Sequence, residues 1–390
     1  MTMTIVVTGG GSGGHITPIL AIAAELKAIR SDVRVVYIGQ RGDKLIDIVH
    51  DNPAIDQVIE VYAGKFRRYH GEGWHQILDI KTQYLNIRDA FRVVAGLCQS
   101  WLLLGRIKPE VVFTRGGFVS VPVALAAKLR GIKYITHDSD STPSLANRLI
   151  YRWADVNAVA MAPETYPYPQ TKTIQVGVPI SNHYIPVSDV QKNIYRKALG
   201  VDNDDMVICV TGGGNGAKKL NDIIRDNAAY LLKKYPKLVL LHIAGRNLDK
   251  ELGREYDAIL DPKSRRRVII KDFVTDLYKY SGAADIVIAR GGATNLAEFA
   301  AQQKACIIIP SKQLIWNIRN AAALAKLGAI IDLSEDQAEQ ELRLASVVSK
   351  LLNNPKQRQN MSNKFAQFAN QDATKDIVEL IIKLIRPAVV

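Results

Sequence analysis

Three glycine-rich segments, each followed by a helical pattern, are the places where this sequence could do chemistry. They lie at residues 9–14, 212–216 and 291–292. Glycine lets backbone N–H groups approach a ligand closely, and the start of the helix behind such a loop favours negative charge. The second loop lacks the GxxxxGK[ST] spacing of a Walker A motif. The pattern therefore predicts phosphate cradles of another kind.

The first loop also contains GxGxxG at Gly9, Gly11 and Gly14, which alone is a weak indication of dinucleotide binding. A bound NAD would need an acidic residue at the end of the second strand to hold the ribose. The strand expected at 33–38 is followed by no acid until Asp43. The sequence therefore does not favour NAD.

His15 closes the first loop after six glycine or serine residues, before a helix expected from about Thr17. The positive end of a helix lowers the pKa of a nearby imidazole, so we expect His15 to be neutral and able to accept a proton. The alternative is a turn histidine whose hydrogen bond is purely structural.

Charged residues follow the other two loops. Lys218 and Lys219 come directly after the second loop and would add positive charge to a phosphate cradle. Glu298 falls about two turns into the helix after the third loop, where a carboxylate can accept hydrogen bonds from two ribose hydroxyls. The alternative for Glu298 is an exposed helix glutamate.

A basic and aromatic run at 64–70 precedes a helical pattern from Trp74 to about Leu104. Apolar residues in this pattern are spaced by three or four, and such a stripe usually belongs to a core. Trp74 and the preceding cations leave open an interfacial patch on anionic lipid, and nucleic-acid binding is the weaker alternative. The best apolar stretch, 93–104, is too short to span a membrane, and we expect no signal peptide. The stripe consists of Ile77, Ile80, Tyr84, Ile87, Phe91, Val94, Leu97 and Trp101.

The composition is that of a globular protein. Of 390 residues, 47% are apolar and 23% charged, which excludes disorder, collagen and coiled coil as the main class. The formal net charge of +13 predicts an anionic partner: nucleic acid, anionic lipid or a phosphorylated substrate. Cys98, Cys209 and Cys306 form no CxxC or Cys/His pair, so we expect three buried, reduced thiols.

Strands alternate with helices in both halves of the chain, which predicts parallel sheets covered by helices on both faces. Residues 8–11 recur as 211–214, and 113–117 recur loosely as 288–292, in the same order. This repetition predicts two similar doubly wound domains. Their expected ranges are 1–180 and 181–370, joined near 178–195. The expected strands are 5–7, 33–38, 111–113, 133–136, 207–210, 238–243, 267–270, 286–289 and 306–309.

Taken together, these segments resemble the MurG family of UDP-N-acetylglucosamine transferases, which belongs to glycosyltransferase family 28. The most specific segment is 9–18, similar to the family's GGGTGGHxxP. Residues 64–69, 116–120 and 290–298 are similar to its GKLRRY, GGYVS and RSGAxTxxE. The resemblance covers nearly the whole chain, and the segments come in the family's order.

The resemblance implies an α/β protein of the GT-B fold, in which two Rossmann-like doubly wound domains face a cleft. The first domain would hold the acceptor on its membrane side and the second the UDP-sugar. The helix from about residue 370 is expected to pack back on the first domain. The implied reaction is inverting, metal-independent transfer of GlcNAc from UDP-GlcNAc to the muramyl hydroxyl of lipid I, forming lipid II in peptidoglycan synthesis.

The implied partners are UDP-GlcNAc, lipid I (undecaprenyl-diphosphate muramyl pentapeptide) and the anionic inner membrane surface, with no nucleic acid and no cofactor. The implied location is peripheral, on the cytoplasmic face of the cell membrane. Backbone N–H groups at 213–217 and 291–293 would meet the charge of the leaving UDP in place of Mg²⁺. Family members use no metal, although Asp138 and Asp140 form an Asp-x-Asp pair that could hold one.

Site residues follow from the same resemblance. Catalysis falls to His15, with Asp138 and Asp140 as residues that could share the role of base. The donor-binding residues are Gly213, Gly214, Asn215, Gly216, Ala217, Phe273, Gly292, Ala293, Thr294, Glu298 and Asn317. The loops for the acceptor and its phosphates contain Gly11, Ser12, Gly13, Gly14, Thr17, Gly116 and Gly117. The membrane residues are Lys65, Arg67, Arg68 and Trp74.

Several segments depart from the family pattern. The family's GGSQGA is 212–217 here, with Gly214 and Asn215 for its Ser and Gln, and its HEQN is the His-Asp-Ser-Asp of 137–140. The paired glutamines of the donor-sugar site are replaced near Asn317. A changed donor sugar therefore stays open. The alternatives are a UDP-sugar transferase acting on another lipid such as diacylglycerol, a UDP-GlcNAc 2-epimerase-type isomerase, and a non-catalytic binding protein.

Overall fold

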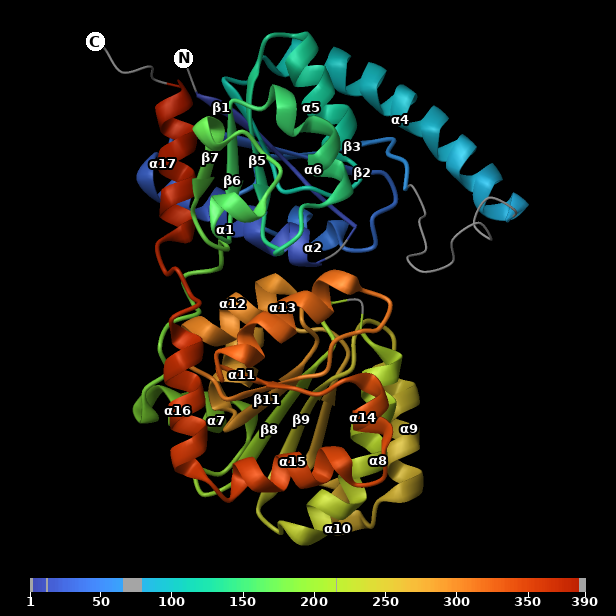
Figure 1. The fold of residues 1–390 in the computed structure, drawn as a ribbon, viewed down its shortest axis with the longest axis vertical. Helices are drawn as coiled ribbons and strands as arrows, with labels where there is room; N and C mark the ends of the chain where they lie inside the picture. Colours follow the sequence, from blue (N-terminus) through green and yellow to red (C-terminus); the bar gives the residue numbers. More distant parts are fainter. Residues whose placement is uncertain (1–2, 12, 66–78, 215, 386–390) are drawn as a thin grey trace. The chain divides into compact units, whose positions relative to one another are not determined.

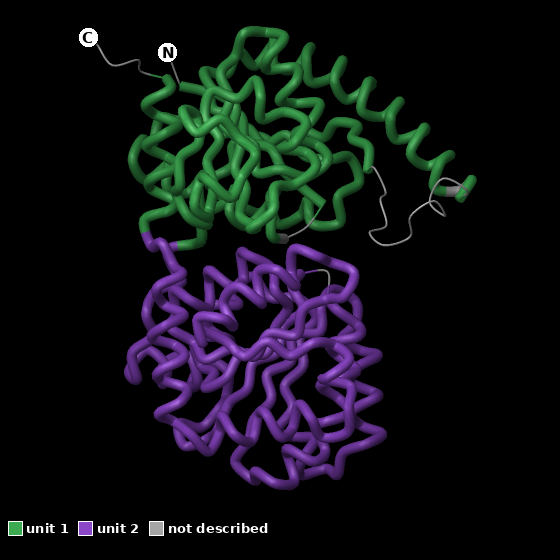
Figure 2. Tube along the Cα trace, in the orientation of Figure 1, with its two compact units in different colours: residues 1–181, 372–390 green, residues 182–371 purple. Residues whose placement is uncertain are grey.

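The structure, a computed structural model, describes residues 3–11, 13–65, 79–214 and 216–385. The chain divides into two compact units (Figure 2). Unit 1 is Met1–Ser181 with Asp372–Val390, and unit 2 is Asn182–Gln371. Each unit is built on its own parallel sheet, as the two similar doubly wound domains of the sequence prediction require.

Within the described residues, unit 1 contains a seven-stranded parallel sheet in the order β3-β2-β1-β4-β5-β6-β7. Its interior strand β1 is buried along its whole length, as expected of a parallel strand with helices on both faces. The strands are β1 (Thr4–Thr8), β2 (Arg34–Gln40), β3 (Gln57–Val61), β4 (Val111–Thr114), β5 (Lys133–Asp138), β6 (Val156–Val159) and β7 (Thr173–Gln175).

The helices of unit 1 cover both faces of this sheet (Figure 1). The last helix, α17, packs against α1 and buries Ile377, Val378 and Ile381 in the same core. On the opposite face, α5 and the end of α4 supply the core. The helices are α1 (Gly13–Ile29), α2 (Ile46–His50), α4 (Ile80–Ile107), α5 (Ser120–Leu129), α6 (Leu145–Ile150) and α17 (Ala373–Ile385), with short 3₁₀ turns at Tyr151–Trp153, Pro163–Thr165 and Gln170–Lys172.

Unit 2 repeats the arrangement with a sheet in the order β10-β9-β8-β11-β12-β13. In both sheets the first strand of the unit lies in the interior, between its second and fourth strands, and both are parallel. The strands are β8 (Met206–Thr211), β9 (Leu238–Ile243), β10 (Val268–Lys271), β11 (Ile286–Ala289), β12 (Cys306–Ile308) and β13 (Ile331–Asp332). This shared topology confirms the predicted α/β class.

Helices cover both faces of the second sheet as well. α8, α9 and α15 share one core, and α7, α11, α12 and α13 share the other. The helices are α7 (Asp189–Leu199), α8 (Lys218–Lys234), α9 (Asp249–Ile259), α10 (Pro262–Arg265), α11 (Leu277–Ala283), α12 (Ala293–Ala301), α13 (Ile315–Lys326), α14 (Glu335–Glu339), α15 (Arg343–Leu352) and α16 (Pro355–Ala366). Cys209 and Cys306 are buried here, but Cys98 on α4 is exposed, so the prediction of three buried thiols is wrong for that residue.

The apolar stripe of α4 faces solvent, contrary to the prediction of a core stripe. Six of its residues, Ile80, Tyr84, Ile87, Phe91, Val94 and Trp101, are between 43% and 83% exposed. The helix packs through its other face, which carries Gly96, Ser100 and Leu104. A Cβ at Gly96 would lie 1.9 Å from the Tyr62 carbonyl oxygen, so only glycine allows this approach. Ile77 lies outside the described residues.

The apolar part of α4 is longer than the stretch at 93–104 that the sequence analysis considered too short to span a membrane. Among the described residues it is the helix that could cross a membrane by length and composition, over Thr82–Ile107. Its second half packs along α5, and Leu104 is fully buried, so this part of the helix belongs to the body of unit 1. Its first turns extend away from the sheet (Figure 1).

Candidate active site

The first glycine loop of unit 1 joins β1 to α1 and is held by Asp43. The Asp43 carboxylate accepts a hydrogen bond from the Gly11 N–H at 2.7 Å, and the Tyr37 hydroxyl donates to the Gly9 carbonyl. α1 begins at Gly13 rather than near Thr17, so His15 lies in its first turn. The N–H of Gly11, which the sequence analysis places in the loop for the acceptor and its phosphates, is therefore engaged within the protein.

The turn after β4 brings a second pair of glycines against this loop. Gly116 and Gly117 have φ angles of +85° and +84°, which favour glycine. A Cβ at Gly117 would lie 2.7 Å from the Gly10 carbonyl oxygen, so the two turns are in direct contact. The space beside Gly116 is bordered by His15 and Ser144, 3.7 and 3.4 Å from the position of its missing Cβ. The predicted acceptor loops therefore meet beside His15.

His15 is oriented by the backbone of Arg115. Its Nδ1 lies 3.1 Å from the Arg115 carbonyl oxygen, and a carbonyl only accepts, so Nδ1 carries the proton and Nε2 is the unprotonated nitrogen. Burial and then the charge of Arg115 lower the pKa of His15 to about 4, against opposing effects of the Arg115 carbonyl and Asp43. The predicted neutral imidazole is confirmed, with these causes in place of the helix end.

Asp138, one of the expected base candidates, is occupied by structural hydrogen bonds. Its Oδ2 accepts from the Tyr168 hydroxyl at 2.5 Å, and its Oδ1 accepts from the Ser144 N–H at 3.0 Å. Burial raises its pKa, although these bonds act in the opposite direction. Asp138 thus anchors the start of α6, where Ser144 is the cap. Asp140 faces the Arg115 guanidinium, whose charge it helps to stabilise.

In unit 2 the predicted donor loop follows β8. The Gly216 N–H donates to the Gly213 carbonyl at 2.9 Å, and this turn leads through Ala217 into α8. The missing Cβ of Gly214 would lie 3.2 Å from the Phe273 ring, which follows β10. The predicted residues Gly213, Gly214 and Phe273 therefore lie together at the carboxyl edge of the sheet, with β9 between the two strands that they follow.

The cations near this loop differ from those expected. Lys218 pairs with Glu251 at 2.6 Å and Lys219 pairs with Glu339, both at exposed positions. Arg246, which the sequence analysis missed, lies closer: its guanidinium carbon is 4.8 Å from the centre of the Phe273 ring. Its backbone N–H also reaches the Gly214 carbonyl at 3.5 Å.

The third loop lies beside the second, because β8 and β11 are neighbouring strands. Gly292 precedes α12, and the Asn317 backbone packs on Gly291, whose missing Cβ would lie 2.4 Å from the Asn317 oxygen. Ala293 and Thr294 form the buried first turn of α12.

Glu298, on α12, is only 6% exposed, so the alternative of an exposed helix glutamate is wrong. The Asn295 side chain donates to its Oε2 at 2.8 Å, and Tyr184 donates a second hydrogen bond. Burial raises the pKa of Glu298 to about 8, although both bonds favour the carboxylate. This side chain is thus a buried carboxyl group close to neutrality, an unusual state that is typical of functional sites.

Several predicted residues lie outside the described part of the chain: Ser12, Asn215, Arg67, Arg68 and Trp74. Lys65 is described, and its ammonium group lies 5.8 Å from the centre of the Phe118 ring. Thr17 and Gly14 are exposed on α1. In the described ranges no group of three or more His, Cys, Asp or Glu side chains could hold a metal ion.

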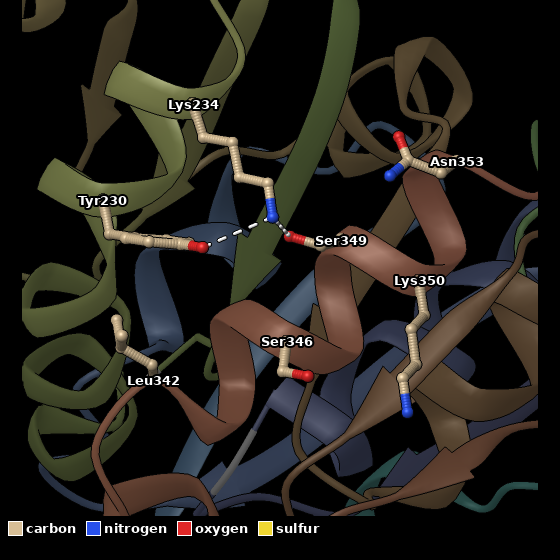
Figure 3. Close-up of a pocket in the computed structure, with 7 residues that line it drawn as sticks. All are labelled: Tyr230, Lys234, Leu342, Ser346, Ser349, Lys350 and Asn353. Carbon is tan, nitrogen blue, oxygen red and sulfur yellow. Dashed lines mark hydrogen bonds between the residues drawn. The ribbon is translucent and has the colours of Figure 1, made fainter.

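A cavity of about 320 Å³ in unit 2 lies between α8 and α15 (Figure 3). Lys234 on α8 crosses it and donates to the Tyr230 and Ser349 hydroxyls at 3.3 and 3.4 Å. Lys234 ends α8, whereas the donor loop precedes the start of the same 17-residue helix, about 25 Å away. The cavity therefore does not belong to the candidate site.

Comparison with known proteins matches each unit separately. Residues 5–159 match the glycosyltransferase family 28 N-terminal domain, and residues 207–377 match the family's C-terminal domain. A Clostridium kluyveri protein is 33% identical over 384 residues, covering 97% of this chain and 99% of its own. The chain belongs to glycosyltransferase family 28. This relative is named UDP-N-acetylglucosamine–N-acetylmuramyl-(pentapeptide) pyrophosphoryl-undecaprenol N-acetylglucosamine transferase. A Borrelia turicatae protein has the same name and is 28% identical over 378 residues, which cover 96% of this chain and 95% of its own.

Solved structures confirm the GT-B fold of this family 28 member. MurG of Acinetobacter baumannii superposes with a TM-score of 0.69 at 21% identity, covering 98% of this chain and 100% of that one. UDP-GlcNAc 2-epimerase of Neisseria meningitidis, bound to UDP-GlcNAc, gives 0.68 at 14% identity with the same coverage. Because a transferase and an epimerase match equally well, the fold alone does not separate these two activities.

Proposed function

We propose that this family 28 enzyme transfers GlcNAc from UDP-GlcNAc to the muramyl hydroxyl of lipid I, forming lipid II in peptidoglycan synthesis. The observation that carries the proposal is the 33% identity, along the whole chain, with a relative named for this reaction. An epimerase needs no acceptor site, whereas unit 1 presents two glycine turns and a neutral histidine in one place.

His15 is the proposed general base. Its Nε2 lone pair takes the proton of the acceptor hydroxyl as that oxygen forms a bond to the anomeric carbon of the donor. The bond from this carbon to the diphosphate oxygen breaks at the same time, and UDP leaves from the opposite face with the electron pair. The configuration is inverted in this single displacement. General bases contribute about 10²–10⁴-fold to rate, and Asp138 is too fully hydrogen-bonded to compete.

The donor is proposed to lie on the second and third loops of unit 2. Helix starts at Ala217 and Gly292 offer backbone N–H groups to the diphosphate, and Arg246 adds a positive charge beside Phe273. These groups would stabilise the leaving UDP without a metal ion. Glu298 would accept hydrogen bonds from the ribose hydroxyls. Gly213, Gly214, Gly216, Ala293, Thr294 and Asn317 would line the same site, with Asn215.

We propose that the enzyme binds peripherally to the anionic cytoplasmic face of the membrane through α4. Six exposed apolar side chains follow this helix at spacings of three, four and seven residues. The cations Arg88 and Arg92 lie on the same helix, where they share the Asp89 carboxylate, and the Lys65 N–H donates to the same carboxylate at 3.3 Å. Arg67, Arg68 and Trp74, outside the described residues, are the other residues that the sequence predicts for this patch. An apolar stripe flanked by cations suits an anionic lipid surface, where the acceptor is embedded.

A UDP-release assay tests the function. The purified enzyme is offered UDP-GlcNAc and other nucleotide sugars, with and without a short-chain lipid I analogue. The proposal predicts release of UDP only when both UDP-GlcNAc and the analogue are present. Conversion of UDP-GlcNAc to UDP-ManNAc without acceptor would identify the epimerase instead. Turnover with diacylglycerol but not with the analogue would identify a different glycolipid transferase.

A further inference from the structure

Three buried polar side chains of unit 2 are joined by hydrogen bonds that end directly behind the proposed donor loop. They are Tyr256 on α9, His242 on β9 and Asn221 on α8, and all are at most 4% exposed. The Tyr256 hydroxyl lies 3.0 Å from His242 Nδ1, and His242 Nε2 lies 3.1 Å from Asn221 Oδ1. The Asn221 amide nitrogen lies 3.0 Å from the Ala244 carbonyl oxygen. This network therefore ties two helices and a strand to one backbone carbonyl.

That carbonyl fixes the direction of every hydrogen bond in the network. The Ala244 carbonyl only accepts, so the Asn221 amide donates to it and the Asn221 oxygen accepts from His242. His242 Nε2 therefore carries the proton, and Nδ1 accepts from the Tyr256 hydroxyl. Burial lowers the pKa of His242 to about 3, which agrees with the neutral ring that this arrangement needs.

The Ala244 carbonyl is also where the segment after β9 contacts the donor loop. A Cβ at Gly216 would lie 2.6 Å from the Ala244 oxygen, so the turn of the loop packs directly on this carbonyl. Two residues after Ala244, the Arg246 N–H reaches the Gly214 carbonyl at 3.5 Å. Asn221 thus holds in place the segment that supports the loop from behind and that carries Arg246, the cation proposed for the diphosphate.

We propose that Asn221 and His242 are positioning residues for UDP binding, which hold the segment after β9 against the donor loop. This inference rests on the proposed function in its placement of UDP on that loop. Both side chains are buried, so they act through the Ala244 carbonyl and not by contact with the nucleotide. Without them the ligand itself would have to order the loop and Arg246, and this ordering would cost affinity.

The first experiment compares two buried asparagines of the same helix. Asn221→Ala removes the hydrogen bond to the Ala244 carbonyl, and UDP affinity measured by calorimetry should fall about tenfold, the effect of one buried hydrogen bond. Asn227→Ala is the matched control, because Asn227 is 6% exposed, donates to the Ile223 carbonyl at 2.9 Å and accepts from the Ala345 N–H at 3.2 Å. Asn227 lies about 9 Å further along α8, so its replacement should lower the melting temperature and leave UDP affinity unchanged.

A pair of substitutions at His242 separates positioning from a general loss of stability. His242→Gln keeps an N–H donor for the Asn221 oxygen, so UDP affinity should stay near that of wild type. His242→Leu removes the donor and should weaken UDP binding about tenfold. In steady-state transfer, Asn221→Ala and His242→Leu should both raise KM for UDP-GlcNAc and leave KM for the lipid I analogue unchanged. The His242 pair decides the question if Asn221→Ala does not fold.

Unchanged UDP affinity in folded Asn221→Ala or His242→Leu would overturn the inference, and so would an equal loss in Asn227→Ala. If wild type binds UDP and these variants weaken the binding, but no GlcNAc reaches the analogue, the inference stands and the proposed function fails. A wild-type protein that binds no UDP would overturn both.

Discussion

Glu298 provides a strict prediction. Its proposed role, accepting hydrogen bonds from the ribose, needs a carboxylate, but in the ligand-free protein the group is mostly protonated at neutral pH. Burial raises the pKa of this carboxyl to about 8, so at pH 7 only about a tenth of the molecules carry the carboxylate. A carboxylate that accepts two ribose hydroxyls must first lose its proton. The free energy of UDP binding at pH 7 should therefore be less favourable by about 1.4 kcal/mol than at a pH well above 8.

The measurement is UDP affinity by isothermal titration calorimetry between pH 6 and 9. The wild-type affinity, relative to Glu298→Gln, should rise about tenfold per pH unit up to pH 8 and then level off. At pH 7, titrations in buffers of different ionisation enthalpy should show that binding releases about 0.9 of a proton. The Gln variant corrects for ionisation of UDP itself.

The same residue affects stability with a definite sign. The pKa of Glu298 is raised above its value in the unfolded chain, so its contribution to folding is full at low pH and is lost as the pH rises through about 8. Thermal unfolding should therefore show wild type losing stability relative to Glu298→Gln between pH 5 and 8. Identical pH dependence of UDP affinity in the two proteins would refute the ribose assignment.

Three further predictions follow from the proposed mechanism and membrane surface. His15→Ala should lower kcat by about 10²–10⁴-fold with UDP affinity almost unchanged, measured by steady-state kinetics and calorimetry, and near-normal turnover would remove His15 from the chemistry. Excess EDTA should leave the rate of transfer unchanged, because backbone N–H groups and Arg246 are proposed to stabilise the leaving UDP; a loss restored by Mg²⁺ would show a metal requirement. Ile87→Glu with Phe91→Glu should abolish co-sedimentation with anionic vesicles, whereas Val190→Glu, at an equally exposed position in unit 2, should not; retained binding of the double variant would contradict the role of α4.

The fold could be predicted because its central strands are buried on both faces. Runs such as residues 5–7 and 207–210 consist of Val, Ile and Cys, and the glycine loops directly after them mark the carboxyl edge of each sheet. Outer strands were missed, because β6 carries a buried Asn157 and β7 is only three residues long. Their sequences give no apolar run, and their place in the sheet is set by tertiary pairing.

Whether the apolar stripe of α4 faces the core or the solvent could not be predicted from its periodicity. Spacings of three and four residues show that one face is apolar, but they do not show what covers it. Here Gly96 allows the opposite face to approach Tyr62, and this backbone contact decides the orientation. The stripe therefore remains at the surface, where Phe91 is 72% exposed.

Within the site, the sequence predicts the residues that stand in or just after a glycine motif. It does not predict single residues that lie outside any such motif. His15 and Glu298 follow glycine loops at recognisable spacings. Arg115 and Arg246 are single arginines at strand ends, and only the folded chain places one beside His15 and the other beside Phe273. The family resemblance makes Asp138 a possible base, and the sequence cannot show that this carboxylate is occupied, because its hydrogen-bond donor Tyr168 comes 30 residues later.

The most direct test of the central claim is the product formed from UDP-GlcNAc labelled in its sugar and a short-chain lipid I analogue. The account predicts a single labelled lipid in which GlcNAc is joined to the muramyl hydroxyl with inverted, β configuration, formed in equal amount to the UDP released. Label that stays in the nucleotide sugar as its 2-epimer, or a product of retained configuration, would contradict it.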